Sequence, residues 1–406
     1  MVNFHILPSS KVPTFKEYSA DAFNMTMILI CEKLTKLGYN TYFYGTEHSS
    51  EAPNLILCTK YINVMKFEEY PFNSNPRIYN SGEYLCATRT ESNKDFADKI
   101  KEFERKFDTV LMNKLKENTQ KDDVIFLCYQ VCCYFQHLTD VKVINLFGFS
   151  GIRDWHANLT NMIFAYRGAL EIKRDLLPWN TEDVFKITTD RWKVIGPPID
   201  FNCFIFNDKP RDPSGPYLYL ARIQNEKGMT GFMALAKHLP YKKFTIAGEG
   251  KYENGILTST SFYSCEINYT MSEYPNVQYV GFADAKKRAE LLSSATALIQ
   301  LSEYDEPFGL NVIEANISGT PALTSDFGAF TETVTNGVNG YRVPRGLKWN
   351  EGYSSIFDKL HLINPEKCRV SAMKYHVDIV VPELVKYSEE VASTKIGIDF
   401  LDLLGH

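Results

Sequence analysis

Strand-like and helix-like segments alternate along most of this chain, and that alternation limits its fold more than any other feature of the sequence. In the C-terminal half the strand candidates are residues 217–221, 244–247, 277–280, 297–301 and 322–324. In the N-terminal half they are 4–7, 41–44, 124–129 and 141–147, with helical spacing over 20–37 and 93–116. Strands that alternate with helices form a parallel sheet covered on both faces. We therefore expect an α/β protein.

The segment NDKPRDPSGP, residues 207–216, separates the two halves. It holds three prolines and one glycine, which can continue neither a helix nor a central strand. A chain of 406 residues is also long enough for two domains. We expect an N-terminal domain over residues 1–206, a C-terminal domain over 215–382, and a final helix over 383–406.

Composition excludes several classes of protein. The net charge of −5 and the pI of about 6.0 argue against a mainly electrostatic binder of polynucleotides. No apolar run reaches the ~18 residues that span a bilayer, and the first residues lack a basic start followed by an apolar core. The nine cysteines are scattered without a Cys-x-x-Cys pair, which is typical of buried, reduced thiols. We expect a cytoplasmic protein.

The most informative motif for function is the pair Glu306 and Glu314 with Pro307-Phe308-Gly309-Leu310 between them. It follows the strand candidate 297–301 and opens a helical pattern, so the first carboxylate is placed in a strand-to-helix loop and the second on the helix. Helix N-termini offer unpaired N–H groups to anions, and a glycine lets a ligand approach the backbone closely. Carboxylates can accept hydrogen bonds from sugar hydroxyls, and the nearby backbone amides can donate to a phosphate. Together they suit a sugar nucleotide.

This stretch resembles the E-x7-E signature of family-4 retaining glycosyltransferases, which have the GT-B fold. The neighbouring segments 319–321, 328–332 and 336–341 are similar to that family as well. The resemblance implies two Rossmann-like domains facing across a cleft, the first for the acceptor and the second for the nucleotide sugar, with the C-terminal helix crossing back to the first domain. It covers most of the second half and the first half only in outline.

Two cations precede the motif, Arg222 after the first strand of the second half and Lys227 five residues later, followed by Gly228. Preset cations stabilise the negative charge that grows on a diphosphate leaving group. Their spacing resembles the family's diphosphate-binding Arg and Lys-Gly pair. The resemblance also implies that Gly281 and Phe282 lie at the nucleotide base, with a structural turn as the other interpretation. Gly248-Glu249-Gly250 fails the dinucleotide pattern, because Glu253 stands where the third glycine would be.

The N-terminal half departs from the family at two places. Residues 13–22 replace its usual glycine-rich loop, although Ser19 and Ala20 leave room for a phosphate. No histidine stands at the tip of the strand ending in Phe147-Gly148-Phe149, and His156 is a candidate substitute. The commoner explanation of His156 is a surface or core histidine whose hydrogen bonds are already made and which has no catalytic role. These departures leave the acceptor and any general base open.

We therefore expect an enzyme that transfers a hexose-like sugar from a nucleotide-diphosphate sugar to a glycan, lipid or protein, with retention of the anomeric configuration. Glu306, Arg222 and Lys227 are its predicted catalytic residues. The predicted binding residues for the nucleotide sugar are Glu314, Phe308, Gly309, Leu310, Gly281 and Phe282. We expect no metal and no cofactor, because no Asp-x-Asp motif is placed at the site. Peripheral contact with a membrane stays open. The alternatives are a GT-B sugar-nucleotide epimerase or phosphorylase, and a catalytically silent module that binds a sugar nucleotide.

Overall fold

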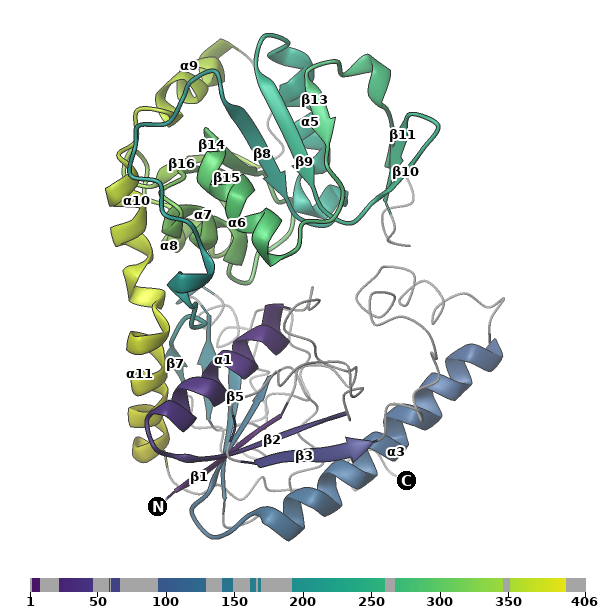
Figure 1. Cartoon of the computed structure of the whole chain (residues 1–406), viewed down its shortest axis with the longest axis vertical. Helices are drawn as coiled ribbons and strands as arrows, with labels where there is room; N and C mark the ends of the chain where they lie inside the picture. The colour runs from purple at the N-terminus through teal and green to yellow at the C-terminus, as the bar shows by residue number, and fades with distance from the viewer. Residues whose placement is uncertain are drawn as a thin grey trace, which may run out of the picture. The chain divides into compact units, whose positions relative to one another are not determined.

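The structure, a computed structural model, describes residues 2–7, 22–46, 58, 60–65, 94–128, 141–148, 161–165, 167–168, 192–259, 267–345 and 351–391. These residues divide into two compact units. The first unit holds those up to Ile199 and from Tyr375 onward, and the second runs from Asp200 to Lys374. Figure 1 shows both units, which we describe one at a time.

The first unit is built on a parallel sheet of seven strands in the order β3-β2-β1-β4-β5-β6-β7. Its strands are β1 (Asn3–Ile6), β2 (Asn40–Thr46), β3 (Lys60–Met65), β4 (Val124–Cys128), β5 (Lys142–Gly148), β6 (Met162–Phe164) and β7 (Lys193–Val194). Its helices are α1 (Ala22–Lys36), α3 (Lys94–Asn118) and α11 (Val377–Glu390).

Two helices from opposite ends of the sequence share one core in this unit. Met27, Ile30 and Leu34 of α1 are buried together with Val381 and Leu384 of α11 against the β-strands. Figure 1 shows these two helices together, with α3 running beside β3. The apolar face of each helix therefore packs on the parallel sheet, because the strands of such a sheet are buried on both faces.

A buried polar cluster ties β1 to its two neighbouring strands. The His5 ring hydrogen-bonds with the Tyr44 hydroxyl at 2.8 Å and with Asp123 Oδ2 at 3.0 Å. Asp123 also accepts from the backbone N–H and the side-chain amide of Asn3. Burial opposes ionisation of Asp123, but the hydrogen bonds from His5, Gln120 and Asn3 outweigh it and lower the pKa of this carboxyl group.

The second unit is built on a parallel sheet of six strands in the order β13-β9-β8-β14-β15-β16. These strands are β8 (Pro216–Leu220), β9 (Lys243–Ala247), β13 (Val277–Tyr279), β14 (Ala297–Gln300), β15 (Ala322–Ser325) and β16 (Gly340–Val343). The helices are α5 (Met229–His238), α6 (Ala285–Ser294), α7 (Leu310–Ile317), α8 (Phe330–Thr333), α9 (Glu351–Leu360) and α10 (Pro365–Ala372). A small antiparallel sheet follows β9 and contains β10 (Lys251–Glu253), β11 (Ile256–Thr258) and β12 (Asn268–Thr270).

Side-chain alternation along β8 explains why this sheet has two cores. Tyr217 and Tyr219 pack with α5 and α9, whereas Leu218 and Leu220 pack with α6, α7 and α8. Successive side chains of a strand point to opposite faces, so five apolar residues in a row bury both faces at once. Figure 1 shows α6, α7 and α8 grouped together, apart from α9.

The predicted strands and the two long N-terminal helices are present, with shifted ends. The strands that were not predicted are β3, β6, β7, β10–β12 and β16. The described part of the predicted final helix lies in α11, which begins at Val377 and carries Pro382 inside it. Among the helices of the described residues, none is both long and apolar enough to cross a bilayer.

Candidate active site

The order of strands in the second unit creates a natural ligand site. Taken along the chain, the order is 3-2-1-4-5-6, so the connections leave β8 and β14 in opposite directions. Ligands of open α/β sheets bind at such a switch point, beyond the carboxyl ends of the strands. The loops after β8 and β14 carry the predicted cations and the first predicted carboxylate.

The loop after β8 lies directly on the end of β14. Gly228 has φ of +85°, and a Cβ there would lie 2.4 Å from the Leu301 carbonyl oxygen. Only glycine permits this approach. The Gln300 side-chain amide donates to the Lys227 carbonyl at 3.0 Å, which joins the two loops. The predicted Lys-Gly pair thus has a structural reason, because Gly228 brings Lys227 to the loop that holds Glu306.

Lys227 and Glu306 form an ion pair. Lys227 Nζ lies 3.1 Å from Glu306 Oε2 and 3.3 Å from Oε1. The side chains are only 16% and 9% exposed, so solvent screens the pair weakly. Glu306 Oε2 also accepts from the Ser302 hydroxyl at 3.2 Å. Lys227 donates a further hydrogen bond to the Tyr304 hydroxyl.

Arg222 differs from Lys227 in its surroundings. Its side chain is exposed, and the described residues offer it no hydrogen-bonding or ion-pair partner. Its backbone is held, because the Tyr219 hydroxyl donates to the Arg222 carbonyl at 2.5 Å. The guanidinium group is therefore available to a ligand beyond the carboxyl end of β8.

The N-terminus of α7 is open. Gly309 precedes the helix with φ of +76°, and no side chain caps the helix there. The structure gives the N–H groups of Gly309 and Leu310 no acceptor within the described residues, so they can meet an anion. Phe308 is 4% exposed, so its ring belongs to the core and only its backbone could face a ligand.

Glu314 lies on α7 and is held by Arg288 of α6. Both Arg288 Nε, at 2.7 Å, and Arg288 Nη2 donate to Glu314 Oε2. Oε1 has no hydrogen bond within the described residues. The pairing leaves one carboxylate oxygen available to a hydroxyl while the arginine fixes the other.

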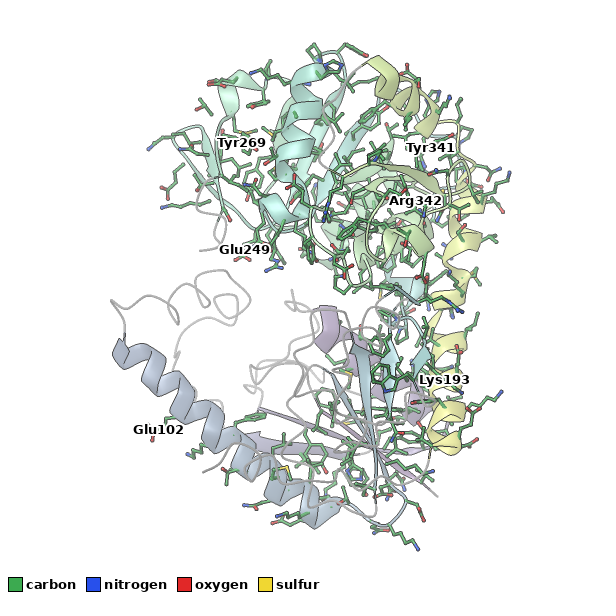
Figure 2. All side chains as sticks on the ribbon, turned by 180° about the vertical axis from the view of Figure 1, so that it is seen from behind. Glu102, Lys193, Glu249, Tyr269, Tyr341 and Arg342 are labelled. Carbon is green, nitrogen blue, oxygen red and sulfur yellow. The ribbon has the colours of Figure 1, made fainter. Side chains whose placement is uncertain are left out.

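Gly281 and Phe282 follow β13 at the same edge of the sheet. The Gly248 N–H donates to the Gly281 carbonyl at 2.9 Å, which joins the ends of β9 and β13. Phe282 is 55% exposed. Glu249, directly after β9, lies at the edge of the unit where β8 and β9 end, as the labelled side chain in Figure 2 and the strand arrows in Figure 1 show. The structure describes no contact that joins Gly281 or Phe282 to Lys227 or Glu306.

Several site residues escaped the sequence analysis. They are Ser302 and Tyr304 in the loop after β14, Gln300 and Asn311, whose side chains bond to each other at 2.6 Å, and Arg288. The first four stand in or beside the motif and could have been found as polar residues in a strand-to-helix loop. No sequence pattern singles out Arg288, because its partner Glu314 is 26 residues away along the chain. The predicted loop at 13–22 and His156 lie outside the described residues, Ala22 excepted. Within the described part of the chain no group of three His, Cys, Asp or Glu side chains could hold a metal ion.

Comparison with known proteins finds sequence similarity in the C-terminal half of the chain. Residues 205–356 match the family model described as Glycosyl transferases group 1. A glycogen synthase of Mycobacterium tuberculosis is 33% identical over 136 residues, which are 32% of this chain and 31% of that protein. A D-inositol 3-phosphate glycosyltransferase of Corynebacterium kroppenstedtii is 23% identical over 192 residues, or 46% of this chain and 40% of that protein. The match spans about a third of the length of the first of these relatives.

Solved structures resemble the chain over nearly its whole length. The Anabaena protein HepE, solved in complex with UDP and glucose, has a TM-score of 0.64 at 14% identity and covers 96% of this chain and 100% of its own. A glycosyltransferase from Rickettsia africae has a TM-score of 0.63 at 13% identity and covers 96% and 98%. The fold is therefore the GT-B fold, with two Rossmann-like units.

Proposed function

We propose that this chain transfers a sugar from a nucleoside-diphosphate sugar to an acceptor hydroxyl, with retention at the anomeric carbon as in family 4. The observation that carries the proposal is the meeting of two loops at the switch point of the second sheet. One loop supplies Arg222 and Lys227, and the other supplies Glu306 and the open N-terminus of α7. HepE, a protein of similar fold solved with UDP and glucose and also with UDP-glucose, supports this class of donor.

The residues divide the donor between them. Arg222 can form two hydrogen bonds with phosphate oxygens, and Lys227 adds a second positive charge. Glu306 accepts from hydroxyls of the donor sugar, and the N–H groups of Gly309 and Leu310 face the sugar or the phosphate. Glu314 offers Oε1 to the ribose, and the base lies over Gly281 and Phe282.

The chemistry follows from where charge develops. The bond between the anomeric carbon and the diphosphate oxygen breaks, and its electron pair passes to that oxygen. For retention, an acceptor hydroxyl forms the new bond to the same carbon on the face from which the diphosphate departs, and its proton passes to the departing diphosphate oxygen. Cations held at the diphosphate stabilise the leaving group more in the transition state than in the ground state, which raises the rate.

The test begins with a thermal-shift screen of nucleoside diphosphates and their sugars. A ligand at about 100 times its dissociation constant should add about 2.7 kcal/mol of stability. Transfer is then measured with the best donor and a panel of glycan, lipid and protein acceptors. Arg222→Ala and Lys227→Ala should each lower transfer by roughly 10²-fold or more, while Lys237→Ala, on the exposed face of α5, leaves it unchanged.

Other outcomes separate the rival functions. Consumption of the donor without any acceptor would indicate an epimerase. Binding of the donor without turnover, against every acceptor, would indicate a silent binding module. Full transfer by both cation variants would remove Arg222 and Lys227 from the site.

A further inference from the structure

Tyr304 has no role in the proposed function. It nevertheless contacts Lys227, one of the two cations that this function requires. Lys227 Nζ donates a hydrogen bond to the Tyr304 hydroxyl and lies 4.5 Å from the centroid of its ring. An ammonium group within about 6 Å of an aromatic ring is attracted by the electrons of that ring. The same side chain thus holds Lys227 by two different interactions.

The protonation state of Tyr304 follows from its surroundings. Burial raises the pKa of Tyr304 far above its ordinary value, and the nearby Glu306 carboxylate raises it further. The hydroxyl group therefore keeps its proton. Because an ammonium group can only donate, the Tyr304 oxygen accepts from Lys227, and its own proton is free to point toward Glu306.

The three side chains therefore form one unit. Lys227 contacts Tyr304 and Glu306, and Tyr304 lies against both of them. A lysine side chain has four rotatable bonds and loses much conformational freedom when it is fixed. A contact that fixes it in advance removes this loss from the chemical step.

We propose that Tyr304 is a positioning residue that holds the Lys227 ammonium group against Glu306. The contact itself is independent of what the protein does, whereas its effect on turnover rests on the proposed function. Under that function, Tyr304 sets the place of the charge that meets the leaving diphosphate. Removing it should therefore act on kcat through Lys227.

The first experiment measures the contact without any substrate. Lysines are acetylated with a limiting amount of acetic anhydride, and the rate at Lys227 is followed by mass spectrometry, with Lys237 as the internal reference. Tyr304→Phe keeps the ring and removes the acceptor, so Lys227 should react about tenfold faster, the size expected for one hydrogen bond to a charged group. Tyr304→Ala should increase the rate further. Tyr241→Phe, at a tyrosine that is 71% exposed, is the matched control and should change nothing.

The second experiment is a double-mutant cycle on transfer. Tyr304→Phe should lower kcat about tenfold in the wild-type background and have no further effect in the Lys227→Ala background. The melting temperature of each variant is measured alongside. A purely structural role for Tyr304 would instead lower the melting temperature and give the same loss in both backgrounds.

The outcomes separate the two proposals. An unchanged acetylation rate at Lys227 in both Tyr304 variants would overturn the positioning role, whatever the enzyme does. If Tyr304→Phe lowers kcat by the same factor in the wild-type and Lys227→Ala backgrounds, Tyr304 does not act on turnover through Lys227. If the wild-type chain neither binds nor turns over any donor, the proposed function fails, and the acetylation rates still decide whether Tyr304 holds Lys227.

Discussion

Lys227 and Glu306 lie in direct contact, although the proposed function assigns them to different parts of the donor. An ammonium group has three hydrogen-bond donors. One donor serves the Tyr304 hydroxyl and one is shared between the two Glu306 oxygens, so a third remains for a phosphate oxygen. The pair can therefore meet a donor as one unit in which the lysine faces the diphosphate and the glutamate faces the sugar.

The two motif carboxylates should respond differently to removal of their charge. Glu306→Gln should depress turnover strongly while the bare nucleoside diphosphate still binds, because that ligand has no sugar for Glu306 to contact. Glu314→Gln should weaken diphosphate and donor together by roughly ten- to a hundredfold, since the ribose is common to both. Calorimetry with the nucleoside diphosphate is the measurement, and Glu290→Gln on the exposed side of α6 is the control. Loss of diphosphate affinity in Glu306→Gln but not in Glu314→Gln would reverse the assignment.

The positive charge at the leaving group comes from side chains in this proposal. Arg222 and Lys227 supply the stabilisation that a divalent cation gives in many phosphate-transferring sites. A chelator added to a working transfer assay should therefore change the rate little. Complete loss of activity with the chelator, restored by magnesium or manganese, would contradict this expectation.

At the scale of elements, the start of α7 depends on one glycine. Gly309 has φ of +76°, and a Cβ there would lie 2.3 Å from Phe330 Cε1 in α8. Gly255 in the β10–β11 turn has φ of +79° and nothing within 4 Å of a Cβ. An alanine at either position would have the backbone strain of a left-handed residue. The two positions differ in the contact with Phe330, which only the Cβ at position 309 would make.

This pair of glycines gives a matched test. Gly255→Ala should destabilise the protein by about 1 kcal/mol through backbone strain. Gly309→Ala should cost about 1–3 kcal/mol more, because Phe330 must move. Urea unfolding of the two variants measures the difference. Equal losses of stability in the two variants would show that Phe330 in α8 moves aside at no cost.

The polar cluster around His5 predicts a pH dependence that belongs to the sheet of the first unit. Because hydrogen bonds lower the pKa of Asp123 in the folded chain, its ionised form stabilises the fold. That contribution is complete above the unfolded value of about 3.9 and is lost as the pH falls through the lower folded value. The stability difference between wild type and Asp123→Asn, from urea unfolding, should be constant from pH 7 to about pH 5 and shrink below about pH 4. A difference that stays constant down to pH 3 would show that the charge is unimportant.

Local patterns predicted most of the strands, and the misses have identifiable causes. Apolar runs identified β8 and β14, whereas β16 carries a glycine and an arginine among its four residues, and its place depends on pairing with β15. The Asn254-Gly255 pair, with both φ angles positive, carried the signal of a tight hairpin between β10 and β11. A two-residue hairpin between short strands lies outside the strand–helix alternation on which the predicted fold rests. The final helix was predicted from residue 383 onward, but it begins at Val377 behind His376, whose ring accepts from the Asp378 N–H.

The candidate site shows the same limit. The E-x7-E spacing located Glu306 and Glu314, because loop and helix are continuous in sequence. It could not predict that Arg288 pairs with Glu314 or that Tyr304 contacts Lys227, 77 residues away. Lys227 meets Tyr304 because β8 and β14 are neighbours in the sheet, and Arg288 meets Glu314 because α6 packs beside α7. Both arrangements are tertiary properties.

At the scale of the whole molecule, every donor residue proposed here lies in the second unit, from Asp200 to Lys374. The proline-rich segment predicted as a linker is part of that unit. Arg211 is 4% exposed, and its guanidinium group donates to the carbonyl groups of Asn207, Ser293, Ser318 and Gly319. Burial lowers the pKa of Arg211, yet an arginine keeps its charge in proteins. The segment is thereby fastened to the ends of α6 and α7.

Two fragments of the chain can separate the contributions of the two units. Residues 200–374 should fold cooperatively and bind the nucleoside diphosphate with nearly the affinity of the full chain, but transfer no sugar, because the first unit is missing. Residues 215–374 lack Arg211 and should be less stable by at least about 2 kcal/mol, since a hydrogen bond to a charged group contributes about 1.5–3 kcal/mol. Urea unfolding and calorimetry measure both properties, and Arg211→Met in the full chain checks that the loss comes from this side chain. If the longer fragment folds and the full chain binds the diphosphate but the fragment does not, the first unit contributes to the nucleotide site, and the assignment of that site to the second unit alone is wrong.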